Sequence, residues 1–242
     1  DDTNEWWRVT WSPELGLFCA VAISGTQRVM TSPDGVTWTG RTCPENGWRG
    51  VSWSPELGLF CSVGISGTQR VMTSPDGITW TGRNQSESNV WVDVTWSPEL
   101  SLFCAVSING TQRVMTSPDG VTWTGRTCPA NGWRGITWSP ELGLFCAVAN
   151  SGTQRVMTSP DGVTWTGRTP SDDTNGWFDI TWSSKLELFC AVARSGTQSV
   201  MTSPDGITWT GRTPSDDTNE WNGITWSPEL GIFCSMSNDG TG

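Results

Sequence analysis

Arg28–Trp38 has the sequence Arg-Val-Met-Thr-Ser-Pro-Asp-Gly-Val-Thr-Trp, and this stretch recurs almost letter for letter along the chain. Its aspartate is repeated at Asp34, Asp76, Asp119, Asp161 and Asp205. A second signal keeps the same spacing, the tryptophan of a Thr-Trp-Ser or Ser-Trp-Ser triplet at Trp11, Trp53, Trp96, Trp138, Trp182 and Trp226. A period of about 43 residues is typical of folds in which one supersecondary unit is repeated.

The repeats run along the whole 242-residue sequence, which predicts a single domain over residues 1–242. Five repeats are complete, and the last one is partial. Their approximate bounds are residues 6–41, 48–83, 91–126, 133–168, 177–212 and, for the partial repeat, 221–238.

Each repeat is expected to form four short β-strands, as residues 133–169 show best. Residues 133–138 alternate and are rich in β-branched and aromatic side chains, whereas residues 144–149 are apolar on both faces. The remaining two strands are expected at 154–158 and 163–166. Between them, Ser-Pro-Asp-Gly predicts a hairpin turn whose aspartate accepts hydrogen bonds from turn amides.

Four antiparallel strands in a repeat of about 43 residues predict an all-β fold, a β-propeller of four-stranded blades. A second strand that is apolar on both faces agrees with this, because each propeller blade lies between two others. Six blades with a short last blade are expected, and a five-bladed ring is the alternative. A β-sandwich and a linear solenoid fit less well. The short last blade would leave an open edge, so a homodimer is left open as well.

The composition excludes several classes of partner. The formal net charge is -10, which disfavours nucleic acid and anionic membrane surfaces as partners. No apolar run approaches the roughly 20 residues that a membrane span needs. The first residues repeat an inter-repeat linker found again at 216–221 and show no signal peptide, so we expect a processed, secreted chain.

The eight cysteines fall into two groups. Six occupy one apolar strand position per repeat and are expected to be small buried side chains: Cys19, Cys61, Cys104, Cys146, Cys190 and Cys234. Cys43 and Cys128 lie in linkers, where free thiols, a local bridge and pairing between chains all remain open. Because the chain has no histidine and no Cys-x-x-Cys, we expect no metal site, and nothing in the sequence calls for another cofactor.

The sequence Ser-Pro-Asp-Gly-Val/Ile-Thr-Trp resembles the Asp-box of sialidase-like propeller blades, with a spacing one residue shorter than usual. The resemblance implies that the repeated aspartate ties a turn and that the tryptophan after it packs into the blade. The tryptophans concerned are Trp38, Trp80, Trp123, Trp165 and Trp209.

An enzyme is not expected. The sialidase mechanism needs a tyrosine nucleophile, and this chain has no tyrosine. The near-identity of the repeats resembles multivalent propeller lectins instead, which implies one small sugar site per blade or inter-blade groove. The expected partners are glycans or glycoproteins with terminal sugars such as N-acetylhexosamines. A protein-binding propeller scaffold without sugar specificity is the alternative.

Three rows of residues are candidates for sugar binding. The tryptophans that open the repeats offer aromatic faces if exposed, or inter-blade packing if buried: Trp6, Trp48, Trp91, Trp133, Trp177 and Trp221. Each lies five residues before the triplet tryptophan and is expected on the opposite strand face. Linker asparagines supply hydrogen bonds: Asn46, Asn131, Asn175 and Asn219. Arginines follow the second turn, with Ser199 breaking the row: Arg28, Arg70, Arg113 and Arg155.

Overall fold

The computed structural model describes residues 3–216 and 218–238. In these residues the chain forms 22 strands in six antiparallel sheets, five with four strands and one with two. The predicted all-β fold of four-stranded units is therefore confirmed. The chain divides into two compact units, Asp1–Arg126 and Thr127–Gly242, and each sheet lies within one unit.

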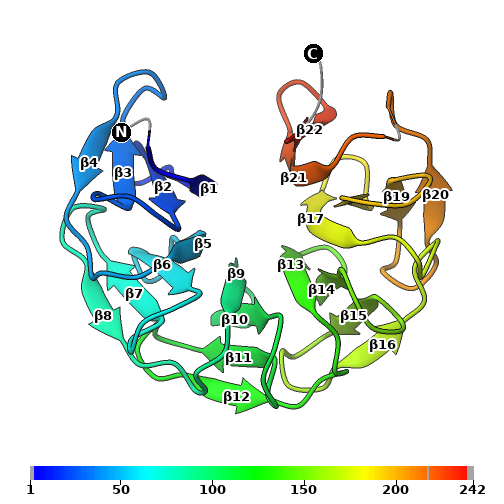
Figure 1. The fold of residues 1–242 in the computed structure, drawn as a ribbon, viewed down its shortest axis with the longest axis horizontal. Coiled ribbons are helices and arrows are strands. Elements are labelled where there is room, and N and C mark those ends of the chain that lie inside the picture. The colour runs from blue at the N-terminus through cyan, green and yellow to red at the C-terminus, as the bar shows by residue number, and fades with distance from the viewer. Residues whose placement is uncertain (1–2, 217, 239–242) are drawn as a thin grey trace. The chain divides into compact units, whose positions relative to one another are not determined.

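The first unit holds three sheets, called blades 1, 2 and 3 (Figure 1). Blade 1 consists of β1 (Trp6–Ser12), β2 (Leu17–Ala22), β3 (Val29–Ser32) and β4 (Thr39–Arg41). Blade 2 consists of β5 (Trp48–Ser54), β6 (Leu59–Gly64), β7 (Val71–Ser74) and β8 (Thr81–Arg83). Blade 3 consists of β9 (Trp91–Ser97), β10 (Leu102–Ser107), β11 (Val114–Ser117) and β12 (Thr124–Arg126).

The second unit holds blades 4 and 5 and the two-stranded blade 6. Blade 4 consists of β13 (Trp133–Ser139), β14 (Leu144–Ala149), β15 (Val156–Ser159) and β16 (Thr166–Arg168). Blade 5 consists of β17 (Trp177–Ser183), β18 (Leu188–Ala193), β19 (Val200–Ser203) and β20 (Thr210–Arg212). Blade 6 consists of β21 (Trp221–Ser227) and β22 (Ile232–Ser237).

The third and fourth strands of each repeat lie later than the sequence pattern predicted. In blade 4 they span Val156–Ser159 and Thr166–Arg168, whereas 154–158 and 163–166 were expected. The reason is the turn between them. The N–H groups of Val163 and Thr164 donate to the Asp161 carboxylate at 2.8 and 2.7 Å, so these residues close the turn instead of pairing across the sheet.

A β-bulge near the start of the first strand corrects the expected orientation of the opening tryptophan. In β5 the register shifts between Trp48 and Gly50. The extra residue at Arg49 moves Trp48 onto the same face as Val51 and Trp53, and all three lie in one buried cluster. The opening and triplet tryptophans therefore share a face, and the prediction of opposite faces is wrong because it assumed an unbroken alternation.

The hydrophobic core lies between consecutive blades, and it explains why the second strand is apolar on both faces. At the junction of blades 1 and 2, the earlier blade contributes Cys19, Val21 and Val29. The later blade covers them with six side chains: Trp48, Val51, Trp53, Phe60, Met72 and Trp80. The junctions of blades 2 and 3 and of blades 4 and 5 repeat this division. In β6, for example, Phe60 belongs to the junction with blade 1, whereas Cys61 and Val63 belong to the junction with blade 3.

A polar contact closes the rim of each of these three junctions. The indole N–H of the later blade's triplet tryptophan donates to a glutamate of the earlier blade's first turn, with Trp53 bonded to Glu14 at 2.7 Å. The equivalent pairs, both at 2.6 Å, are Trp96 with Glu56 and Trp182 with Glu141. The glutamate of Ser-Pro-Glu-Leu thus joins one blade to the next.

Candidate functional site

The five Ser-Pro-Asp-Gly turns are built alike. In blade 1, one oxygen of the Asp34 carboxylate accepts the N–H groups of Thr37 and Val36 at 2.7 and 2.8 Å and the Ser32 hydroxyl at 3.0 Å. These bonds, with that from Thr37 the strongest, lower the pKa of Asp34. The same backbone bonds recur at Asp76, Asp119, Asp161 and Asp205. Each carboxylate is committed to its own turn, so this row holds hairpins together.

The opening tryptophans do not lie where a sugar could stack on them. Four have no exposed surface: Trp48, Trp91, Trp133 and Trp177. Each of these donates its indole N–H to a linker carbonyl, as Trp48 does to Pro44 at 2.8 Å. Trp6 and Trp221 are half-buried. The stacking role does not fit the four buried side chains, because packing and linker anchoring occupy them fully.

The linker asparagines tie each linker to the second turn of the following blade. Asn46 is 3% exposed; its side-chain nitrogen donates to the Gln69 carbonyl at 2.8 Å, and its side-chain oxygen accepts the Ser66 N–H at 3.1 Å. Equivalent donations to a turn carbonyl are made by Asn4, Asn89, Asn131 and Asn175. Sequence reasoning missed Asn4 and Asn89, although both stand two residues before an opening tryptophan. Asn219 is half-buried.

The arginines after the second turn share one bond and differ in another. Each donates its Nε to the carbonyl of its own turn glycine, at 2.9 to 3.1 Å, in Arg28, Arg70, Arg113 and Arg155. Arg155 also donates Nη1 to Thr174 and Asn175 carbonyls in the next linker, at 3.0 and 2.8 Å. Arg70 does the same toward Ser88 and Asn89. Among the described residues, the Arg28 Nη atoms have no such acceptor.

Linker length accounts for this difference. The linker of blades 1 and 2 spans residues 42–47, that of blades 2 and 3 spans 84–90, and that of blades 4 and 5 spans 169–176. In the two longer linkers, an additional backbone carbonyl accepts a hydrogen bond from the arginine Nη1. It is the carbonyl of Ser88 for Arg70 and that of Thr174 for Arg155. The short linker brings no such group, so the guanidinium of Arg28 faces a groove that remains open.

A pocket of about 340 Å³ lies in this groove. It is lined by Gly25, Thr26 and Arg28 from the second turn of blade 1 and by Cys43, Pro44 and Glu45 from the linker to blade 2. The Glu45 side chain is exposed, and those of Cys43 and Pro44 are half-buried. The pocket therefore combines a cation, a carboxylate and an apolar proline ring, and its volume falls in the range of small-ligand sites.

The Cys43 thiol is a poor nucleophile in this pocket. Burial raises the pKa of Cys43, and the nearby Arg28 backbone N–H and charge oppose that rise only in part. The thiol is therefore protonated at neutral pH, and reactivity at cysteine requires the thiolate. No disulfide forms among the eight cysteines, all of which lie in the described residues; five are buried in strands as expected, whereas Cys234 is exposed.

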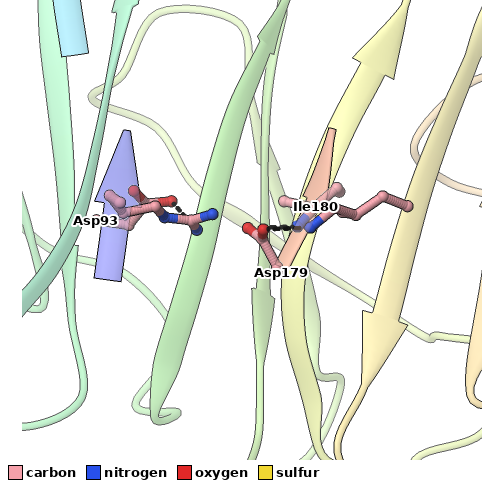
Figure 2. A network of polar contacts seen from close by, with 5 residues as sticks. Asp93, Asp179 and Ile180 are labelled. Carbon is pink, nitrogen blue, oxygen red and sulfur yellow. Dashed lines mark hydrogen bonds and ion pairs between the residues drawn. The ribbon is translucent and has the colours of Figure 1, made fainter. Parts of the chain in front are cut away.

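Two buried aspartates on the first strands of blades 3 and 5 were not singled out from the sequence. Asp93 forms an ion pair with Arg8 at 3.2 Å (Figure 2). At Gly50 an added Cβ would lie 2.7 Å from the Asp93 Cα, so the close approach of the two strands requires glycine there. Asp179 accepts the N–H groups of Ile180 and Ile224 at 2.9 and 2.8 Å (Figure 2). Both carboxylates act as ties between blades.

The described residues contain no group of three or more metal-ligating side chains. Within 3–216 and 218–238, no helix is long and apolar enough to cross a membrane.

Comparison with known proteins identifies the architecture. No protein-family model and no curated protein matches the chain. Among solved structures, an inactive virginiamycin B lyase from Staphylococcus aureus has a TM-score of 0.80 at 12% identity, over 93% of this chain and 75% of that one. A chain of a nidogen/laminin complex scores 0.68 at 14% identity, over 91% and 84%. YCF48 from Cyanidioschyzon merolae scores 0.61 at 15% identity, over 93% and 90%.

The fold is that of a β-propeller. At these identities the likeness extends to the fold alone, since a propeller scaffold carries unrelated functions. The function of this β-propeller therefore depends on the residues of its own site.

Of the predicted site residues, the structure places Arg28 in this pocket. It also places there three linker residues that the sequence had not indicated as sugar-binding: Cys43, Pro44 and Glu45. A signal for them was present in the linker lengths, which are irregular while the strands are nearly identical. The other members of the predicted rows with side-chain bonds to backbone carbonyls of turns are Asn46, Asn131, Asn175, Arg70, Arg113 and Arg155. The groove of blades 1 and 2 is the candidate functional site.

Proposed function

We propose that the chain is a non-enzymatic lectin that holds a terminal monosaccharide in the groove between the second turn of blade 1 and the linker to blade 2. The observation that carries this proposal is the pocket of about 340 Å³ in which Arg28 and Glu45 are both available to a ligand. The net charge of -10 agrees with a neutral ligand rather than a polyanion.

The chemistry of the pocket suits an uncharged polar ring. A carboxylate such as Glu45 accepts hydrogen bonds from hydroxyl or amide hydrogens, and a guanidinium such as Arg28 donates to hydroxyl or carbonyl oxygens. An N-acetylhexosamine offers both kinds of group in its acetamido substituent. The methyl of that substituent would pack on the Pro44 ring, so one small group would satisfy the three different surfaces of the pocket.

The repeated architecture supports a multivalent mode of binding. Resemblance of the repeat to Asp-box propellers and to propeller lectins favours several sites per chain, and weak sites gain strength on a glycan-dense surface. The linkers, however, are unequal, so the sites are expected to be unequal too. The groove between the second turn of blade 1 and the linker 42–47 is expected to bind sugar with the highest affinity. Its expected partners are glycoproteins outside the cell.

The proposal is tested by titrating a panel of monosaccharides into the full chain by isothermal titration calorimetry. Glu45→Ala and Arg28→Ser should each weaken binding about 10- to 100-fold, as expected for a lost hydrogen bond to a charged group. Both substitutions imitate residues that the chain already uses at the equivalent positions, Ala130 and Ser199. Thr42→Ala, in the same linker but outside the pocket lining, is the control and should bind as the parent does.

Two outcomes contradict the proposal. One is the absence of heat and of saturation-transfer NMR signals for every sugar of the panel. The other is an affinity for sugar that neither Glu45→Ala nor Arg28→Ser changes, since the binding site would then lie elsewhere in the chain. Turnover of an aryl glycoside would instead indicate an enzyme.

A further inference from the structure

Two arginine side chains of the second unit gather on one phenylalanine, where blades 4 and 5 meet. The Cζ atom of Arg194 lies 3.6 Å from the centre of the Phe178 ring, and the Cζ atom of Arg134 lies 5.3 Å from the same point. Contact with an aromatic ring stabilises a guanidinium through its flat face. The N–H donors lie in the plane of the group and point away from that contact, so they are directed toward another acceptor.

The local fold explains why these three side chains meet. Arg134 and Phe178 are the extra residues at the β-bulges near the starts of β13 and β17. Both are therefore displaced from the regular alternation of side chains that packs the core. Arg194 directly follows β18, and its backbone N–H donates to the Gly176 carbonyl at 3.0 Å. This bond holds Arg194 beside the start of β17.

The cluster has two positive groups close together. Burial lowers the pKa of Arg134, and the positive charge of Arg194 lowers it further. Burial also lowers the pKa of Arg194, and the Glu220 carboxylate opposes this effect. The Asp179 carboxylate, on the same strand as Phe178, accepts two backbone N–H groups. Because like charges repel, an anion bound to both arginines would stabilise the cluster.

Arg134 also has an unused hydrogen-bond donor. Its Nε is buried and has no hydrogen-bond partner among residues 3–216 and 218–238. The turn arginines differ, since Arg70 and Arg155 donate Nε to glycine carbonyls. Native structures leave few buried donors unpaired, so an acceptor outside the described residues is expected at this nitrogen.

The junction of blades 1 and 2 provides a comparison inside the same chain. There the Cζ atom of Arg49 lies 4.2 Å from the centre of the Trp7 ring. The position of Arg194, directly after the second strand, is held by Ile65 in blade 2. The pair of arginines is therefore a feature of the second unit, although the contact between arginine and aromatic ring occurs in both units.

We propose that Arg134 and Arg194 bind the carboxylate of a small monoanionic ligand beside Phe178. The planar guanidinium matches a carboxylate, which accepts parallel hydrogen bonds from it, and the Arg134 Nε donates one of these bonds. The net charge of -10 repels a dianion such as phosphate more strongly than a monocarboxylate. This site is separate from the sugar groove of blades 1 and 2, so either can exist without the other.

The site is tested by NMR titration of the full chain, labelled with ¹⁵N at arginine, with sodium acetate at constant ionic strength. The Nε–H signals of Arg134 and Arg194 should shift along one saturable curve. Arg194→Ile and Arg134→Val should each weaken acetate binding about 10-fold or more, because each removes hydrogen bonds between charged groups. Both imitate residues that the chain already uses at the equivalent positions, Ile65 and Val92.

Two further variants separate the site from a general effect of charge. Arg49→Val removes a guanidinium from the other aromatic contact and should bind acetate as the parent does. Glu220→Gln removes the carboxylate that acts on Arg194 and should tighten acetate binding, since the ligand no longer competes with it. A purely structural pair of arginines gives neither the saturable shift nor this gain.

Three results would overturn the proposal. The first is a parent chain whose Arg134 and Arg194 signals show no saturable shift with acetate. The second is an acetate affinity that neither Arg194→Ile nor Arg134→Val changes. The third is tighter binding of inorganic phosphate or sulfate than of acetate in the same titration, because the site would then not be one for a carboxylate.

Discussion

The junction of blades 1 and 2 and the junction of blades 4 and 5 share one core and differ at one rim. Both cores combine a cysteine and two valines of the earlier blade with the tryptophans, phenylalanine and methionine of the later one. At the rim, however, Arg155 is bonded to the linker carbonyls of Thr174 and Asn175, whereas Arg28 faces a pocket. The strands determine the hydrophobic core of a junction, whereas the linker between the two blades determines whether its rim is open to a ligand.

The strongest test of this comparison is an exchange of linkers. Replacing residues 43–45 by the five-residue segment 170–174 should supply carbonyl acceptors to Arg28 and remove Glu45. Because two hydrogen bonds to charged groups are then lost, the affinity for the sugar should fall by roughly 100-fold or more. Calorimetry measures the affinity, and thermal unfolding checks that the core is intact. An exchanged chain that binds like the parent would show that linker length does not control the site.

A smaller effect is expected at the junction of blades 5 and 6, where the glutamate of the other junctions is replaced by Lys185. The buried indole nitrogen of Trp226 has no acceptor there. Lys185→Glu should provide one and raise the free energy of unfolding by about 1 kcal/mol, the usual net gain from one hydrogen bond. Denaturant unfolding measures the change. Lys185→Gln, which offers a neutral acceptor, should raise the free energy of unfolding by less. A loss of stability in both variants would contradict a stabilising role for the hydrogen bond between the tryptophan and the glutamate.

The smallest expected difference concerns the Ser-Pro-Asp-Gly turns, which are alike at both junctions. The pKa of Asp76 is lowered, chiefly by the Thr79 N–H, and that of Asp161 is lowered because its hydrogen bonds outweigh the opposing effect of burial. A folded-state pKa below the unfolded value of about 3.9 contributes stability above that pH, and the contribution is lost as pH falls through the folded pKa.

Parent stability should therefore decline from about pH 4 downward, a window set by the unfolded-state aspartate pKa. Asp76→Asn and Asp161→Asn should each flatten the decline by a similar amount, because both turns make the same bonds. Urea midpoints between neutral and acidic pH measure this. A steep dependence in one turn variant and none in the other would show that the turns are not equivalent.

Sequence periodicity predicted the four-stranded sheets and the doubly apolar second strand, because one hydrophobic pattern is imposed on every copy. It misplaced the opening tryptophans, since a bulge such as that at Arg49 reverses strand alternation without any mark in the apolar pattern. It also placed the fourth strand too early, because Val163 and Thr164 have strand-like sequences but bind the Asp161 carboxylate.

The candidate site was harder to predict than the fold. Arg28 was in the predicted row, yet nothing in its own sequence separates it from Arg155. The difference arises from two added residues in a linker more than ten positions away, and their effect depends on where the linker backbone passes. Irregular lengths between regular repeats are the signal that points to such a site.

The most direct measurement is a crystal structure of the full chain soaked with an N-acetylhexosamine. We expect a sugar ring between Arg28 and Glu45, with its acetamido group within hydrogen-bond distance of both and its methyl on Pro44. The proposed site is contradicted by a sugar bound beside Arg155 while the groove beside Arg28 stays empty. It is also contradicted if the crystal shows no bound sugar at a concentration that saturates binding in solution.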